Sequence, residues 1–263
     1  MINIDKYAYS SKLKQTAPLK KLTFAMLALG VGLWADSVPV SVLVLLIMGY
    51  CTIYKGGTPI SLFIKLMLVP ISFLIIGVLT IAINASGNKD IFLFSIAAWG
   101  THIGVSQLGM QQAAHLFFKA MGAVSCLYFL ALSTPMVDLL AVLRKLKVPK
   151  LMLELMGLIY RFIFVLLETA DTIHTAQSSR LGYLNLTSGY CSLVALTSTL
   201  FIRAYKRSDE LYTALEARGY DGELNVLEEP YKTHWTEYIA PVMINLALVG
   251  LALLLKQYTG GVL

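Results

Sequence analysis

The chain has 263 residues, of which 57% are hydrophobic and 14% are charged, and its formal net charge is +6. Soluble domains carry about 25% charged residues. The composition therefore excludes an ordinary soluble domain and predicts an all-α, polytopic membrane protein with about five to seven membrane-associated helices. Membrane topology explains the positive charge better than nucleic-acid binding does, and the length leaves no room for a separate nucleotide-binding domain.

The first 21 residues carry five lysines against a single acidic residue. A basic segment of this kind stays on the cytoplasmic side. This predicts a multi-pass protein of the cell membrane with a cytoplasmic N-terminus. The apolar run that follows ends at Ala35-Asp36-Ser37 without a small-x-small cleavage pattern, so we expect it to be retained.

Five membrane crossings are predicted, at 22–34, 40–54, 61–83, 111–132 and 238–255. The first two form a tight helical hairpin, because Ser37 and Pro39 supply a cap and a first-turn proline for the second helix. Segment 84–107 is expected outside the membrane. Its apolar part, 91–98, either lies along the interface or re-enters the bilayer.

About half of the 21 basic residues lie between 134 and 232, whereas the outside loops have almost none. The positive-inside rule therefore places this region in the cytoplasm. The chain accordingly divides into an N-terminal cytoplasmic segment with transmembrane helices (1–133), a cytoplasmic helical region (134–232) and a C-terminal transmembrane helix (233–263). Acidic residues are about as numerous in the middle region, which favours a protein-facing surface over a polybasic lipid anchor.

The cytoplasmic region is expected to open with a short amphipathic helix at 138–147. Two apolar segments, 151–167 and 186–202, follow and could be mistaken for spans. If both dipped into the membrane, the number of crossings would rise from five to seven. If both crossed, the stretch around Arg180 would lie outside, against the charge rule.

Two arginines stand close before a glycine in helical patterns. Arg218 is followed by Gly219, and Arg180 is followed by Leu181 and then Gly182. We expect each arginine in the last turn of a helix, where the dipole favours a cation, with a left-handed residue ending the helix. A rigidly held guanidinium suits docking on a second protein, because it offers bidentate geometry to carboxylates. The alternative is two ordinary helix ends.

Glu154, Arg161 and Glu168 are spaced seven residues apart and share one helical face. Charged residues in an apolar helix can form a proton or ion path. We favour the simpler interpretation that this charge stripe pairs with neighbouring helices of the scaffold.

No enzyme motif is present, neither a phosphate-binding loop nor His-Glu-x-x-His, Cys-x-x-Cys or a nucleophile elbow. The chain is therefore expected to be no enzyme and to need no cofactor, and any ATP hydrolysis belongs to another chain. His102 and His115 lack a third ligand nearby, so no metal site is expected. Cys51, Cys126 and Cys191 lie in apolar runs and are predicted to be core residues rather than a disulfide framework.

The order of these features resembles the transmembrane (T) component of energy-coupling factor (ECF) transporters, and in particular the CbiQ-type subunit of cobalt or nickel uptake systems. The resemblance covers essentially the whole chain. It rests on Ile4-Asp5-Lys6-Tyr7-Ala8-Tyr9, Thr134-Pro135, Tyr160-Arg161-Phe162, the stretch from Ala176 to Gly182, and Leu215-Glu216-Ala217-Arg218-Gly219-Tyr220-Asp221-Gly222. In the first arginine element, Leu181 separates Arg180 from the glycine.

This resemblance implies a non-catalytic scaffold in a prokaryotic cell membrane. Its implied partners are two ABC-type ATPase subunits and a small membrane subunit that captures cobalt or nickel. The implied ATPase-coupling residues are Ala176, Arg180, Gly182, Ala217, Arg218 and Gly219. Cobalt uptake, feeding cobalt-dependent cofactor synthesis, is the expected activity. The alternatives are a nickel-specific or shared vitamin-importing T component and, in another class, an ATPase-independent secondary transporter or channel that uses the charge stripe.

Overall fold

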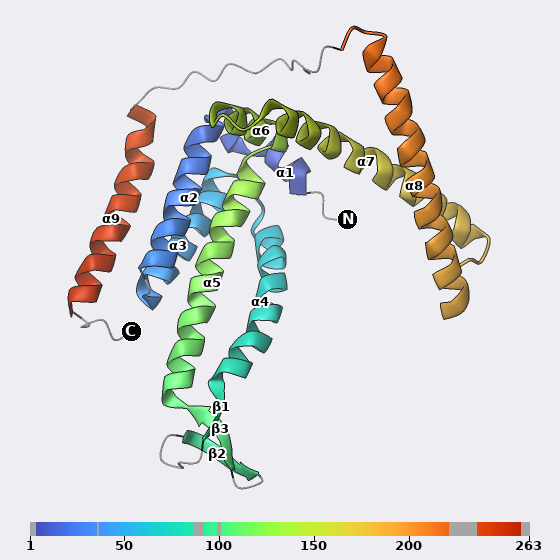
Figure 1. Cartoon of the computed structure of the whole chain (residues 1–263). Helices are drawn as coiled ribbons and strands as arrows, with labels where there is room; N and C mark the ends of the chain where they lie inside the picture. The colour runs from blue at the N-terminus through green and yellow to red at the C-terminus, as the bar shows by residue number, and fades with distance from the viewer. Residues whose placement is uncertain (1–3, 36, 87–91, 99–100, 221–235, 259–263) are drawn as a thin grey trace. The chain divides into compact units, whose positions relative to one another are not determined.

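The computed structural model describes residues 4–35, 37–86, 92–98, 101–220 and 236–258. These residues are mostly helical, and they belong to two compact units. The first unit contains Met1–Leu139 and Pro230–Leu263, and the second contains Leu140–Glu229 (Figure 1). The predicted all-α class is confirmed.

The first unit holds the membrane helices. Its helical elements are α1 (Ile4–Ser10), the 3-10 helix η1 (Lys12–Gln15), α2 (Pro18–Trp34), α3 (Val38–Tyr50), the π-helix η2 (Cys51–Lys55), α4 (Ile60–Ala82), α5 (Gln107–Ser133) and α9 (Thr236–Tyr258). Among the described residues, four stretches are long and apolar enough to cross a membrane, namely Val38–Lys55, Ile60–Ile81, Gly109–Ser133 and Ile239–Gln257. With α2, which has 17 residues, they match the five segments predicted from the sequence.

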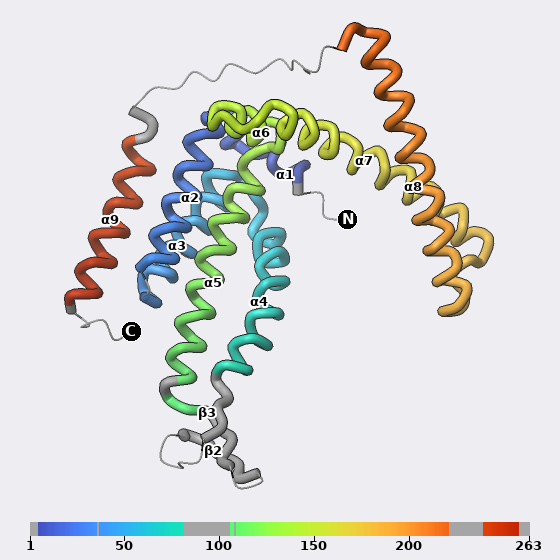
Figure 2. Tube along the Cα trace, in the orientation of Figure 1, coloured from blue at the N-terminus to red at the C-terminus, as the bar shows by residue number. Residues whose placement is uncertain are grey.

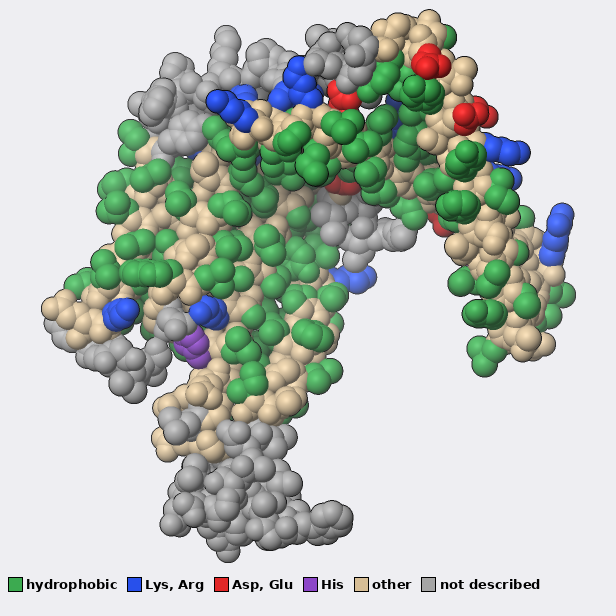
Figure 3. Space-filling model, viewed as in Figure 1, with side chains coloured by type: hydrophobic (Ala, Val, Ile, Leu, Met, Phe, Trp, Pro, Cys, Tyr) green, Lys and Arg blue, Asp and Glu red, His purple; other side chains and the backbone are tan. Residues whose placement is uncertain are grey.

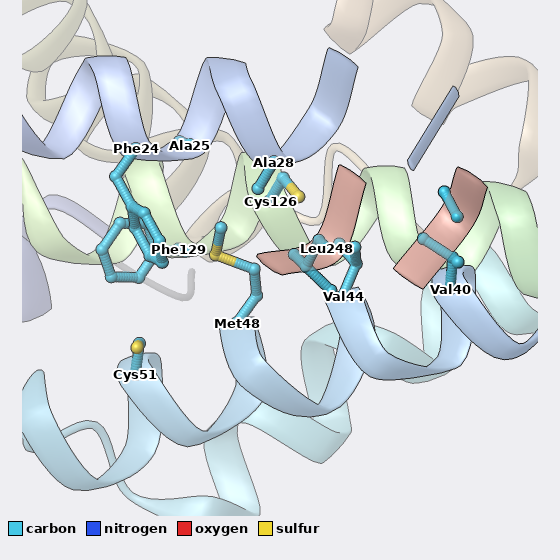
Figure 4. Packing of buried hydrophobic residues seen from close by; sticks show 11 residues of the cluster. Phe24, Ala25, Ala28, Val40, Val44, Met48, Cys51, Cys126, Phe129 and Leu248 are labelled. Carbon is cyan, nitrogen blue, oxygen red and sulfur yellow. The ribbon is translucent and has the colours of Figure 1, made fainter. Parts of the chain in front are cut away.

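The core of this unit lies where α2, α3 and α5 meet α9. Phe24 of α2 packs edge-to-face on Phe129 of α5, with ring centroids 5.7 Å apart. Met48 of α3 and Leu248 of α9 join the same buried cluster (Figure 4). Small residues let these helices approach closely, as is usual in membranes. A Cβ atom on Gly122 of α5, for example, would lie 3.1 Å from the backbone oxygen of Ser41 in α3.

α4 packs on α5 and is otherwise largely uncovered. The hydroxyl of Tyr128 in α5 donates a hydrogen bond of 3.1 Å to the backbone oxygen of Leu66 in α4. Side chains such as Val69, Phe73 and Ile76 are exposed. Figure 3 shows hydrophobic side chains covering much of this face of the first unit. In a bilayer such a surface meets lipid tails.

The N-terminal segment is tied to the membrane helices at two places. The backbone N–H of Lys12 and the hydroxyl of Ser11 both donate to the backbone oxygen of Gly56, at 3.1 and 3.0 Å. The ammonium of Lys21, a residue only 4% exposed, donates to the backbone oxygens of Leu13 and Ser133, at 3.1 and 2.8 Å. Lys21 therefore joins η1, α2 and the end of α5.

A small antiparallel sheet lies between α4 and α5. It consists of β1 (Ile83–Ser86), β2 (Phe92–Ala98) and β3 (Thr101–Ser106), in the order β1-β3-β2. The apolar stretch 91–98, expected either to lie along the interface or to re-enter the bilayer, is thus an extended strand over its described part. Pairing with β3 satisfies backbone groups that an isolated extended segment would leave open.

The second unit is built mainly from two long helices, α7 (Lys150–Ser179) and α8 (Leu186–Glu216), which have 30 and 31 residues (Figure 2). The preceding helix α6 (Met136–Lys145) corresponds to the short amphipathic helix expected at 138–147. The apolar segments 151–167 and 186–202 are only the first halves of α7 and α8. Neither helix is among the four candidate spans, so the two extra crossings find no support.

Candidate functional site

The end of α8 positions Arg218. Gly219 has φ +75°, and its backbone N–H donates to the oxygen of Glu216 at 3.0 Å. The N–H of Tyr220 reaches back to the oxygen of Leu215, also at 3.0 Å. These two bonds form the Schellman pattern, in which a left-handed residue closes the last turn. Arg218 stands directly before that residue and is exposed.

The end of α7 has the same backbone pattern around Arg180. Leu181 has φ +62°, and its N–H donates to the oxygen of Ser178 at 3.0 Å. The N–H of Gly182 donates to the oxygen of Gln177 at 2.9 Å. Arg180 is exposed and directly precedes the left-handed residue, so it is the structural equivalent of Arg218.

The shared pattern changes how the two motifs align. Leu181, rather than Gly182, occupies the left-handed position that Gly219 occupies in α8. By the same count Ser179, rather than Ala176, corresponds to Ala217. Sequence reasoning did not include Leu181 in the site, because leucine is rarely left-handed. The only sign in the sequence that Leu181 takes the position of Gly219 is that Leu181 separates Arg180 from Gly182.

Gly182 is required by packing. A Cβ atom on it would lie 2.7 Å from the hydroxyl oxygen of Ser192 and 2.9 Å from the backbone oxygen of Gln177. The hydroxyls of Ser188 and Ser192 both donate to the backbone oxygen of Gly182, at 2.9 and 2.8 Å. The start of α8 therefore lies directly against the turn that follows Arg180.

Side chains also hold this turn in place. The amide of Gln177 donates to the backbone oxygen of Ser192 at 3.0 Å, and the hydroxyl of Tyr183 donates to the Gln177 side-chain oxygen at 2.7 Å. The ring of Tyr183 also lies against His174, with centroids 4.8 Å apart. Interlinked polar contacts of this kind give a connection little freedom. We call these residues, Gln177, Tyr183, Ser188 and Ser192, the turn network.

The two arginines lie at opposite ends of a helical hairpin. The hydroxyl of Tyr220, just after α8, donates to Oε2 of Glu154 near the start of α7, at 3.2 Å. Arg218 is therefore close to the start of α7, whereas Arg180 is at its end. With a rise of 1.5 Å per residue, the 26 residues from Glu154 to Arg180 correspond to about 40 Å.

The charge stripe divides into one contact and two exposed groups. Glu154 is half-buried and receives the Tyr220 hydrogen bond, whereas Arg161 and Glu168 are exposed. Residues seven apart on a helix are about 10 Å from each other along the axis, so the three cannot pair among themselves. The structure thus gives Glu154 a role in closing the hairpin.

Among the side chains that the structure describes, no group of three or more His, Cys, Asp or Glu residues could hold a metal ion. The side chain of His102 lies outside the described part. Cys51 and Cys126 are buried, as predicted, but Cys191 is exposed on α8. The core prediction for Cys191 was wrong because the apolar run around it forms an uncovered part of a long helix.

Residues 9–228 match the cobalt transport protein family CbiQ. This match spans most of the chain and includes both arginine-bearing helix ends. The chain belongs to the CbiQ family. Its resemblance to the T component of ECF transporters is thereby confirmed.

Members of the CbiQ family and its ECF relatives align over much of the chain. An uncharacterized protein of Methanocaldococcus jannaschii is 33% identical over 256 residues, which cover 97% of this chain and 94% of the relative. Cobalt transport protein CbiQ of Salmonella typhimurium is 29% identical over 86% of this chain and its own full length. The ECF transporter transmembrane protein EcfT of Ruminiclostridium cellulolyticum is 34% identical, with 64% of this chain and 70% of the relative covered.

Proposed function

We propose that this chain is the coupling subunit of a cobalt importer, joining two ABC-type ATPases in the cytoplasm to a substrate-capturing membrane subunit. ATP hydrolysis is assigned to the ATPases and metal capture to the membrane partner. Membership of the CbiQ family supports the transport role. The observation that carries the coupling role is the occurrence of one helix-end structure at both ends of one hairpin, each with an exposed arginine.

The physical basis of coupling is rigidity. Each arginine is attached to a helix end whose last backbone groups are internally bonded, so the guanidinium moves with the helix. A carboxylate-bearing groove on each ATPase can take one guanidinium in a bidentate pair. When ATP closes the ATPase pair, the two grooves move, and helices of about 45 Å carry the displacement toward the membrane.

Cobalt is preferred over the alternative substrates because of the relatives. The Salmonella cobalt transport protein matches along its full length, whereas the EcfT relative matches over a smaller share of the chain. A nickel-specific or a shared vitamin-importing T component would use the same arginine ends. The membrane subunit that copurifies with the chain distinguishes these cases.

The test is purification of the chain from native membranes, with identification of copurifying proteins. Wild type should bring two ATPase subunits and a small metal-binding membrane protein. The Arg180→Glu, Arg218→Glu double variant should lose the ATPases and cobalt uptake, because each reversed charge repels a carboxylate partner. Arg203→Glu, an exposed arginine within α8, is the matched control and should behave as wild type.

Normal cobalt uptake by the double variant contradicts the proposal. So does a wild-type chain that purifies alone and transports ions in vesicles without any ATPase. In that case a secondary transporter or channel based on the charge stripe would replace the coupling role.

A further inference from the structure

Leu181 adopts a backbone conformation that leucine normally avoids. Its φ of +62° places it in the left-handed region, where a Cβ crowds the following carbonyl oxygen. At the equivalent position of α8 the residue is Gly219, which has no Cβ and meets no such penalty. The α7 end thus keeps a leucine where glycine would be more stable. Strained residues of this kind tend to occur at functional sites.

The Leu181 side chain gains little from its own chain. It is 64% exposed, and two neighbours in the connection, Leu184 and Leu186, are 67% and 96% exposed. We call these three leucines the apolar turn surface. Figure 3 shows hydrophobic side chains along the whole length of the α7–α8 hairpin, and not only near its turn. Around Arg218 the described residues end at Tyr220; among 213–220 no large hydrophobic side chain is exposed, and the nearest earlier one is Tyr212, which is 57% exposed.

The apolar turn surface is presented in a defined orientation. The turn network fixes the backbone of the connection, through bonds from Gln177, Ser188 and Ser192. The leucines follow Arg180 within six residues of the chain, so a protein surface that binds the guanidinium lies close to them. A group on a rigid backbone loses little conformational freedom on binding, which favours affinity.

We propose that the apolar turn surface, with Leu181 at its centre, is the hydrophobic part of the ATPase contact at the Arg180 end. The partner surface it fits is a groove on an ATPase subunit with an apolar floor beside a carboxylate. The Arg218 end docks mainly through charge. This inference rests on the proposed coupling function and makes the two ends chemically different.

A lipid surface fits these residues less well. Burial of the leucines in hydrocarbon would bring Arg180, on the same turn, toward the bilayer, where a cation is costly. A protein groove can supply the carboxylate that a lipid tail cannot. An apolar contact that excludes water from an ion pair also reduces the screening of that ion pair by salt. The Arg180 contact should therefore resist salt better than the Arg218 contact.

The decisive variant is Leu181→Gly. Glycine keeps the left-handed turn and relieves its strain, but it removes the apolar group. The thermal midpoint of the purified chain in nanodiscs should stay the same or rise. Binding to the purified ATPases should weaken about tenfold, as expected for the loss of a buried leucine. A merely structural residue would not move stability and binding in opposite directions.

Chains that keep only one of the two arginines make the test more specific. In Arg218→Glu, where the Arg180 end alone holds an ATPase, Leu181→Gly should weaken the remaining binding by at least the same factor of about ten. In Arg180→Glu it should add little. Leu181→Asn, which tolerates the left-handed conformation, should repeat the loss, whereas Leu193→Ala, an exposed leucine elsewhere on α8, should bind as wild type. The binding of Arg218→Glu should change less between 50 mM and 500 mM salt, about a threefold change in Debye length, than that of Arg180→Glu.

The outcomes distinguish a failure of the apolar contact from a failure of the proposed coupling role. If Arg180→Glu weakens ATPase binding but Leu181→Gly and Leu181→Asn leave it unchanged, the apolar contact is refuted and the coupling role stands. If the Arg180→Glu, Arg218→Glu double variant binds ATPases normally, the coupling role itself fails.

Discussion

Gly219 and Gly182 belong to the two arginine ends, yet the structure requires them for different reasons. Gly219 has a left-handed backbone and nothing within 4 Å of its Cβ position. Gly182 lacks positive φ, but its Cβ position is blocked by Ser192 and by the backbone of Gln177. Gly219 is therefore required for its backbone conformation and Gly182 for lack of space, although both follow an arginine in the sequence.

These two causes predict different responses to substitution. Gly219→Ala should destabilise the α8 end by about 1–2 kcal/mol, the penalty of a left-handed L-residue, and Gly219→Asn should recover part of the loss. Gly182→Ala should cost about 1–3 kcal/mol through overpacking, and Gly182→Asn should be no better. Thermal unfolding of the four variants in nanodiscs checks this. An equal benefit from Asn at both sites would contradict the distinction.

At the scale of elements, Lys21 joins three segments through its ammonium group. Its two acceptors are backbone oxygens of η1 and of the last residue of α5. The last carbonyls of a helix, such as that of Ser133, have no intrahelical partner, and a buried cation is a suitable donor for them. Lys21 thereby connects the N-terminal segment to the point from which the chain enters α6.

Lys21→Met should destabilise this junction. The substitution keeps the buried stem but removes the ammonium donor from the backbone oxygen of Ser133, at a cost of about 1–3 kcal/mol, whereas the oxygen of Leu13 still accepts from Thr16. Lys6→Met, at an exposed lysine of α1, is the control and should change stability by less than about 0.5 kcal/mol. Thermal unfolding and proteolysis between η1 and α2 measure the effect. Equal stabilities of the two variants would show that the Lys21 contacts contribute nothing.

At the scale of the whole molecule, the proposed orientation places the N-terminus and the second unit in the cytoplasm. Cys191 offers a direct probe, because it is exposed while Cys51 and Cys126 are buried. A membrane-impermeant thiol reagent should label the chain in inside-out vesicles and not in right-side-out vesicles. Cys191→Ser should remove the signal. Adding Ala35→Cys, in the predicted outside turn, should restore labelling with the opposite sidedness. Labelling of Cys191 from the outside would reverse the topology.

Much of this protein could be predicted from its sequence, because the features concerned depend on neighbouring residues. Apolar length and low charge determined the membrane helices, because a helix satisfies its backbone groups within its own segment, as lipid requires. The arginine-glycine pairs indicated both helix ends, since helix termination depends on a few adjacent residues. Family motifs, which are also local, indicated the T component.

Only the tertiary structure decided how the local pieces combine. The equivalence of Leu181 and Gly219 appears in backbone torsions, which the residue types argued against. The Tyr220–Glu154 contact joins residues 66 apart, and Lys21 meets the end of α5 across 112 residues. The exposure of Cys191 and the strand at 92–98 likewise depend on which neighbours are present. These features arise from long-range packing and hydrogen bonding, which periodicity and composition do not encode.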